Sequence, residues 1–208
     1  MKIKHFIIIT LLLSTLISCE KDTEPTQVLD ELSLEDKLKG IPGFRVTRIY
    51  PSTPDELFSE TYKIMVTQPV DHENPEGPSF QQALYLKHRS EHDPVILHTE
   101  GYESSESRTS DINLLFSSNY VGIEHRYYGE STPTNIDWQY LTIEQAAADH
   151  HKIVESLKTV YNGKWLSTGG SKGGMAALFH KRFYPDDVDA TVVSVAPIIL
   201  DLPDLRID

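Results

Sequence analysis

The chain has 208 residues, of which 39% are hydrophobic and 24% are charged, and this is the composition of a globular protein. It carries 31 acidic against 19 basic residues, a net charge of −12. Because so acidic a surface repels phosphate backbones, we expect no nucleic-acid partner. The single cysteine excludes an internal disulfide and a zinc site built from thiolates. Nothing in the sequence implies a metal or an organic cofactor.

The N-terminus has the pattern of a bacterial export signal. Two lysines precede an apolar run, Phe6 to Ile17, that is short for a membrane span. The run leads into Leu16-Ile17-Ser18-Cys19, which resembles the lipobox at which lipoprotein signals are cut and the cysteine is acylated. We therefore expect a signal peptide over residues 1–19 and a lipid anchor on Cys19. That anchor would hold the protein to a bacterial membrane of the cell envelope, facing the periplasm or the cell exterior. An ordinary signal peptide with a chance cysteine is the alternative.

Residues 20–43 begin with a polar, acidic stretch and are predicted to form a tether. Within them, residues 27–38 have the character of a short charged helix. A glycine- and proline-containing turn at 40–43 then separates the tether from the rest of the chain.

Three segments after the tether alternate apolar with polar residues, at 44–50, 61–67 and 80–88. A period of two predicts strands with one buried face. The segment 68–78 between the last two is rich in turn-forming residues. The sequence therefore predicts an antiparallel β meander at the start of the folded part.

The pattern then changes to short apolar runs that are typical of strands buried on both faces. These runs lie at 95–97, 120–123, 165–168 and 190–196. A helix is predicted over 142–161, because Thr142 and Gln145 have the spacing of a capping box and an Asn-Gly pair follows. Strands that alternate with helices indicate an α/β fold, with a mainly parallel sheet and helices on both faces. We assign residues 44–208 to this one domain.

A glycine cluster carries the clearest chemical signal. Gly169-x-Ser171-x-Gly173 lies between a predicted buried strand and a helix, which is the context of the nucleophile elbow in α/β-hydrolases. Glycines on either side let the backbone approach closely while the turn presents the serine hydroxyl. A phosphate-binding loop is disfavoured, because Gly174 is followed by Met175 where that motif needs lysine. A plain glycine-rich turn remains open.

An elbow also requires donors for the oxyanion that forms during acyl transfer. The backbone N–H of Lys172, which follows the serine, is the first expected donor. The second is expected from the loop 98–102, at Gly101 or Tyr102, although an ordinary strand-end turn is the alternative. The Lys172 side chain is expected to be either solvated or paired with an acidic residue.

Five blocks of sequence together resemble a known family. In order they are Gln68-Pro69-Val70-Asp71-His72, Thr99-Glu100-Gly101-Tyr102, Glu124-His125-Arg126-Tyr127-Tyr128-Gly129-Glu130-Ser131, Leu141-Thr142-Ile143-Glu144-Gln145-Ala146 and Gly170-Ser171-Lys172-Gly173-Gly174. They resemble the secreted bacterial tripeptidyl-aminopeptidase family of serine peptidases, the PS-ten type, which is related to the prolyl carboxypeptidases. Lysine at position 172 favours the tripeptidyl group, since an aromatic residue is common there in the other. The resemblance covers about residues 44–208.

This resemblance implies an α/β-hydrolase that releases short fragments from peptide N-termini through an acyl-enzyme on Ser171. Such enzymes hold the free amine of the peptide with acidic groups, for which Glu100, Glu124 and Glu130 are candidates. The alternative is that Glu124 belongs to a structural hydrogen-bonded network with His125 and Arg126. On the same scaffold an esterase or lipase is a second hypothesis, and a non-catalytic surface lipoprotein that binds peptides or glycans is a third.

The proton acceptor that a serine nucleophile needs is not evident. In α/β-hydrolases the acid and then the histidine follow the serine, yet after Ser171 this chain offers only His180, on the elbow helix. His98 or His125 would be bases in an order without precedent for this fold. We therefore expect an N-terminal portion of a longer enzyme. We also expect this polypeptide alone to have negligible peptidase activity, and marginal stability because of an open sheet edge.

Overall fold

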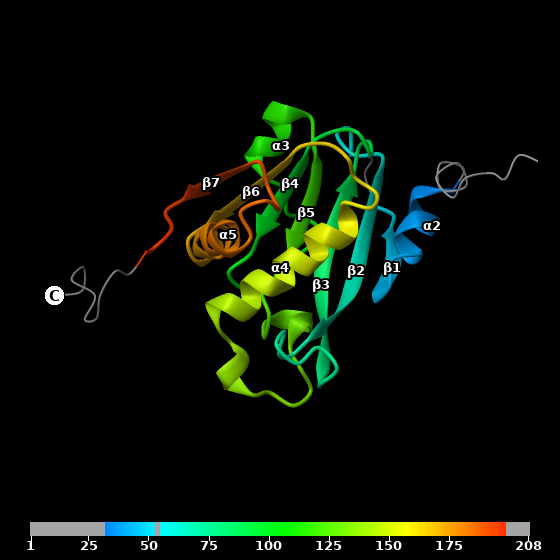
Figure 1. The fold of residues 1–208 in the computed structure, drawn as a ribbon. Coiled ribbons are helices and arrows are strands. Elements are labelled where there is room, and N and C mark those ends of the chain that lie inside the picture. The colour runs from blue at the N-terminus through cyan, green and yellow to red at the C-terminus, as the bar shows by residue number, and fades with distance from the viewer. Residues whose placement is uncertain (1–31, 53–54, 199–208) are drawn as a thin grey trace, which may run out of the picture. The chain divides into compact units, whose positions relative to one another are not determined.

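The computed structural model describes residues 32–52 and 55–198. Its centre is a seven-stranded sheet in the order β1-β2-β3-β5-β4-β6-β7 (Figure 1). The strands are β1 (Phe44–Ile49), β2 (Glu60–Pro69), β3 (Ser79–His88), β4 (Val95–Thr99), β5 (Asn119–Ile123), β6 (Trp165–Gly170) and β7 (Ala190–Ser194). The helices are α2 (Leu34–Lys39), α3 (Asp111–Phe116), α4 (Ile143–Leu157) and α5 (Lys172–Phe183), with 3-10 turns at Gly129–Ser131 and Trp138–Tyr140.

The first three strands form the predicted antiparallel meander. Val46 pairs with Ile64, and Ile64 in turn pairs with Leu84, so apolar residues from three strands line up on one face. β3 then pairs antiparallel with β5, while β5, β4, β6 and β7 run parallel to one another. The predicted α/β architecture, with a meander ahead of a parallel region, is confirmed.

Helices α4 and α5 pack against each other over one face of the sheet (Figure 1). α4 connects β5 to β6 and α5 connects β6 to β7, and both connections run toward the β7 edge of the sheet. α3 connects β4 to β5, which runs in the opposite direction. Right-handed crossovers therefore put α3 on the opposite face. In the core, Ile153, Val154 and Leu157 of α4 are fully buried against the sheet.

The N-terminus of α4 is capped differently from the prediction. Thr142 Oγ1 accepts the N–H of Gln145 at 3.2 Å, as expected of a cap. The Gln145 side chain does not return to the cap residue, because it accepts the N–H of His72 and donates to Asp71, both at 2.9 Å. The predicted capping box is therefore half formed, and Gln145 instead ties α4 to the turn after β2. The helix also ends at Leu157, before the predicted end at residue 161.

The folded unit begins earlier than predicted. Ser33 caps α2, and Leu34, Leu38 and Ile41 are buried members of the core. Chain contacts group Ser33 onward with the sheet. A tether through residue 43, with a domain that starts at residue 44, is therefore wrong for residues 33–43. Residues 1–31, including the predicted signal peptide and Cys19, lie outside the described residues. None of the described helices has the length and apolarity to span a bilayer.

Candidate active site

Ser171 occupies the sharp turn that the motif predicts. β6 ends at Gly170 and α5 begins at Lys172, so the serine alone joins strand to helix. Its backbone has φ 52° and ψ −126°, an arrangement that non-glycine residues rarely adopt, and the residue is exposed. A strained, exposed serine between a buried strand and a helix is the geometry of a nucleophile elbow.

The glycines around Ser171 are required by the packing. A Cβ on Gly169 would lie 2.8 Å from the backbone nitrogen of Gly174, so the strand and the first turn of α5 nearly touch. Thr99 Oγ1 at the end of β4 donates to the Gly173 carbonyl at 2.8 Å. The Ser171 N–H donates to the Ser194 carbonyl of β7 at 3.0 Å. Neighbouring strands on both sides of β6 thus hold the turn in its strained form.

The loop after β4 lies directly against the elbow. A Cβ on Gly101 would be 2.6 Å from the Cβ of Lys172 and 2.8 Å from the nitrogen of Gly173, and only glycine permits this approach. The backbone N–H groups of Gly101, Tyr102 and Lys172 donate no hydrogen bond within residues 32–52 and 55–198. The structure therefore brings Gly101 against Lys172 and leaves the N–H groups of the three candidates without a partner among these residues, and their role as oxyanion donors stays a prediction.

The Lys172 side chain follows neither of the two expectations. Its Nζ lies 4.2 Å from the ring centroid of Tyr128 and 4.9 Å from that of Tyr102, and it donates to the Tyr128 hydroxyl at 3.2 Å. The two rings meet edge to face, with centroids 5.2 Å apart. Instead of being solvated or ion-paired, the ammonium is held by two tyrosines, and the loop sequences alone contain no signal for this contact.

Two of the three candidate glutamates bond to other parts of the chain. One oxygen of Glu124 accepts from the Ser131 N–H and Oγ at 2.9 and 2.8 Å, and the other accepts from the Ser104 N–H at 3.0 Å. The exposed Glu130 pairs with Lys63. Glu124 therefore has a structural role, but it anchors loops and does not bond to the side chains of His125 and Arg126.

Glu100 is the third glutamate, and it precedes Gly101. It accepts from Arg108 at 3.1 Å, while its second oxygen is buried without a hydrogen bond among the described residues. Burial raises the pKa of this carboxyl, although Arg108 acts against the shift. A role for Glu100 in holding a substrate amine stays a prediction.

Arg126 belongs to a separate buried network. Its guanidinium makes a bidentate pair with Asp149 of α4 at 2.7 and 2.8 Å, and both side chains are fully buried. It also donates to backbone carbonyls that include those of Val70 and Tyr140, and His72 approaches the same carboxylate at 2.7 Å. The predicted structural network therefore exists, but its acid is Asp149 and not Glu124.

The described histidines near the elbow are mostly buried. Burial lowers the pKa of His125 to about 4, and its Nδ1 donates to the Arg126 carbonyl at 2.9 Å, which leaves Nε2 as the unprotonated nitrogen. His180 lies in α5, and its Nε2 is 2.7 Å from a carboxylate oxygen of Asp187 in the loop that follows that helix. Within residues 32–52 and 55–198, no hydrogen bond joins the Ser171 side chain to a histidine.

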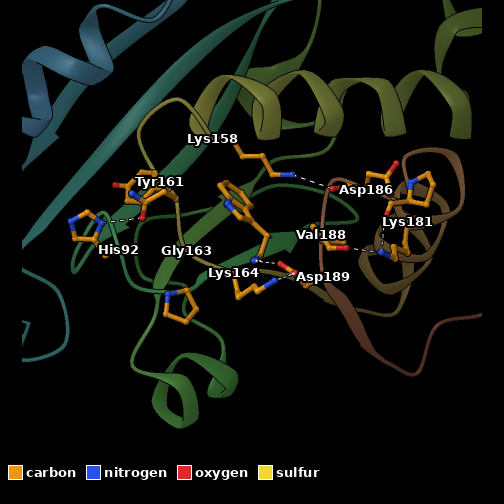
Figure 2. A pocket seen from close by; sticks show the side chains of 13 residues that line it. His92, Lys158, Tyr161, Gly163, Lys164, Lys181, Asp186, Val188 and Asp189 are labelled. Carbon is orange, nitrogen blue, oxygen red and sulfur yellow. Dashed lines mark hydrogen bonds and ion pairs between the residues drawn. The ribbon is translucent and has the colours of Figure 1, made fainter. Parts of the chain in front are cut away.

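A cavity of about 800 Å³ lies at the other end of the sheet. Its lining includes Trp165, the first residue of β6, whereas Ser171 follows the last. Figure 2 shows Lys158, Lys164 and Lys181 directed at the segment 186–189, where each has an oxygen partner. Ser171 therefore does not line this cavity. Beside the elbow, a small apolar cavity is lined by His125, Lys172 and residues of α4 and α5.

Comparison with known proteins agrees with this geometry. The family model described as PS-10 peptidase S37 matches residues 24–202. The chain belongs to this family. Prolyl tri/tetrapeptidyl aminopeptidase from Streptomyces mobaraensis is 38% identical over 168 residues, which are 80% of this chain and 34% of that protein. Lysosomal Pro-X carboxypeptidase from Mus musculus is 30% identical over 168 residues, 70% of this chain and 34% of its own length.

The S37 chain spans about a third of the length of these relatives. Among solved structures, acetyl xylan esterase 1 from Thermoanaerobacterium aligns with a TM-score of 0.50 at 14% identity, over 75% of this chain and 53% of that one. At that identity the match supports the α/β-hydrolase fold alone. Among the described residues, no group of three or more His, Cys, Asp or Glu side chains is placed to hold a metal ion.

Proposed function

We propose that the protein is a serine exopeptidase of the tripeptidyl-aminopeptidase kind, with Ser171 as its nucleophile. The observation that carries this is the strained turn at Ser171, with the free N–H groups of Lys172 and Gly101 beside it. The match to the S37 family and the 38% identity to a prolyl tri/tetrapeptidyl aminopeptidase supply the reaction class. The substrate is then a peptide with a free N-terminus.

In this reaction the Ser171 oxygen bonds to a peptide carbonyl carbon, and its proton passes through a base to the leaving amine. The carbonyl oxygen becomes negative and is stabilised by the N–H groups of Lys172 and of Gly101 or Tyr102. The C–N bond then breaks, which leaves an ester on Ser171, and water hydrolyses that ester. The strained turn leaves Ser171 exposed at the end of β6, where a substrate carbonyl can reach its hydroxyl.

A mass-spectrometric experiment tests the nucleophile. The full chain is treated with a peptidyl diphenyl phosphonate, and the modified residue is located after digestion. We expect the phosphonate on Ser171, with slow formation because no described histidine is bonded to that side chain. Ser171→Ala should abolish the adduct, and Ser107→Ala, at an exposed serine outside the elbow, should not. An adduct spread over surface serines would refute the proposal.

The class of substrate is tested with three phosphonates that differ in one part. One carries a tripeptide with a free amine, the second carries the same tripeptide acetylated, and the third carries only an alkyl chain. An exopeptidase should react fastest with the first. An esterase or lipase should favour the alkyl reagent, and equal rates with the first two would remove the requirement for a free amine.

We also propose that Cys19 carries a lipid and anchors the enzyme to a membrane of the bacterial cell envelope, in the periplasm or at the cell surface. The support is the order of a basic start, an apolar run and the chain's only cysteine. Metabolic labelling with an alkyne fatty acid should mark the wild type in the membrane fraction. Cys19→Ser should lose both the label and the membrane association, and a labelled Cys19→Ser protein would contradict the proposal.

A further inference from the structure

We propose that the Lys172 side chain is a positioning residue that locks the two halves of the oxyanion hole together, an inference that rests on the proposed function of Ser171. The two halves come from segments far apart in sequence. Lys172 supplies one backbone N–H itself, and the loop that contains Gly101 and Tyr102 supplies the other. Their separation decides whether both can reach one oxygen, so it must be fixed before the reaction.

Steric contact with the elbow limits movement of the loop in one direction only. Gly101 lies against Lys172 and Gly173, which stops the loop from moving inward. On the outward side, the Tyr102 carbonyl accepts the His125 N–H at 3.0 Å, and the Tyr102 side chain is exposed. The Lys172 ammonium lies over that exposed ring at 4.9 Å. It is therefore the side-chain contact that ties Tyr102 back to the elbow.

Tyr128, in the loop after β5, contacts the same ammonium from a third segment. We call the contacts of Lys172 with Tyr102 and Tyr128 the clamp. Lys172 Nζ contacts its ring face at 4.2 Å and its hydroxyl at 3.2 Å. Tyr128 also packs edge to face on Tyr102 and on His125. One ammonium thus joins the elbow, the loop that contains Gly101 and Tyr102, and the loop after β5. Each cation–π contact strengthens where solvent is partly excluded.

In this proposal the Lys172 ammonium holds the loops in position and does not bind the substrate. Lys172 is half-buried, and the hydrogen-bonding partner of its ammonium is a tyrosine hydroxyl of the same chain. We therefore expect loss of the ammonium to slow the covalent step and to leave the initial binding of a peptide unchanged. A lysine that bound substrate directly would do the reverse.

The test compares the full-length wild type with Lys172→Met, Lys172→Arg and the control Lys164→Met, whose lysine is exposed at the other end of the sheet. The first measurement is amide hydrogen exchange at His125, because that N–H is bonded to the Tyr102 carbonyl. We expect exchange about tenfold faster in Lys172→Met, the factor that a pair of cation–π contacts supports. Lys172→Arg, which keeps a cation over both rings, and Lys164→Met should match the wild type.

The second measurement is phosphonylation of Ser171 by the free-amine phosphonate, separated into the binding constant and the rate of the covalent step. Lys172→Met should slow the covalent step about tenfold or more at constant binding, and Lys172→Arg should restore it. Unchanged exchange at His125, or weakened binding with an unchanged covalent rate, would overturn the clamp. If wild-type Ser171 does not react, the proposed function fails, and the exchange measurement alone then decides whether the clamp exists.

Discussion

The glycines in the elbow region differ in whether a Cβ would fit at their position. At Gly101 an added Cβ would lie 2.6 Å from the Cβ of Lys172, a distance that side chains do not tolerate. At Gly170, the last residue of β6, the nearest atom to such a Cβ is the Ser194 hydroxyl at 3.5 Å, an ordinary contact. The two glycines therefore form a matched pair for mutation, since close approach requires the first and not the second.

We expect Gly101→Ala to push the loop after β4 away from the elbow, because the new methyl group has no space against Lys172. Phosphonylation of Ser171 should slow by about tenfold or more, since a donor aimed at the oxyanion would be lost. Gly170→Ala is the control and should react at the wild-type rate. Equal rates for the two variants would show that the approach of Gly101 does not matter for the site.

Among the elements, α4 is fixed to the sheet by charge as well as by apolar packing. Asp149 lies in the middle of the helix and is fully buried, and it pairs with the fully buried Arg126 in the segment after β5. The same guanidinium also holds the carbonyls of Val70 and Tyr140. Since a buried charge without its partner is costly, the position of α4 depends on this one carboxylate.

We expect Asp149→Asn to lower the free energy of unfolding by about 3–5 kcal/mol, because it leaves Arg126 buried without a counter-charge. Asp93→Asn, which breaks the exposed pair with Arg89, should cost at most about 1 kcal/mol. Urea unfolding followed by circular dichroism measures both. A loss at Asp149 no larger than that at Asp93 would show that the buried pair contributes no more than a surface pair.

The elements that can be predicted from the sequence are those whose signal is local. Strands with alternating or continuous apolar residues, the Thr142 cap and the elbow at Ser171 all follow from neighbouring residues. Helix α3 gives no such signal, because Leu114 and Leu115 are exposed and its sequence lacks the buried stripe of a packed helix. The contacts of Arg126 and Lys172 are also beyond prediction from sequence, because their partners are distant in the chain and no spacing rule connects them.

At the scale of the whole molecule, buried histidines set the response to acid. Burial lowers the pKa of His98 and His125, the latter to about 4, and holds the pKa of His150 well below 6.5. The unfolded chain therefore binds more protons than the folded one as the pH falls below 6.5. Stability from these groups is present above that pH and is lost as the pH falls below it, for His125 between pH 6.5 and about 4. Glu100, whose pKa is raised by burial, acts in the opposite direction.

We therefore expect the urea concentration at the unfolding midpoint to decrease when the pH is lowered from 7.5 to 5. Replacing the fully buried His150 with Phe, which cannot accept a proton, should reduce this pH dependence, whatever its effect on stability at pH 7.5. His92→Gln, at an exposed histidine, controls for the loss of one imidazole. A midpoint that does not change with pH in the wild type would show that the buried histidines are not linked to folding.

The bond from the Ser171 N–H to the Ser194 carbonyl has a consequence for biosynthesis. A ribosome releases the serine before it releases β7, so an emerging chain that stops short of Ser194 lacks the acceptor that supports the strained turn. The strained turn at Ser171 is therefore completed only after β7 has left the exit tunnel.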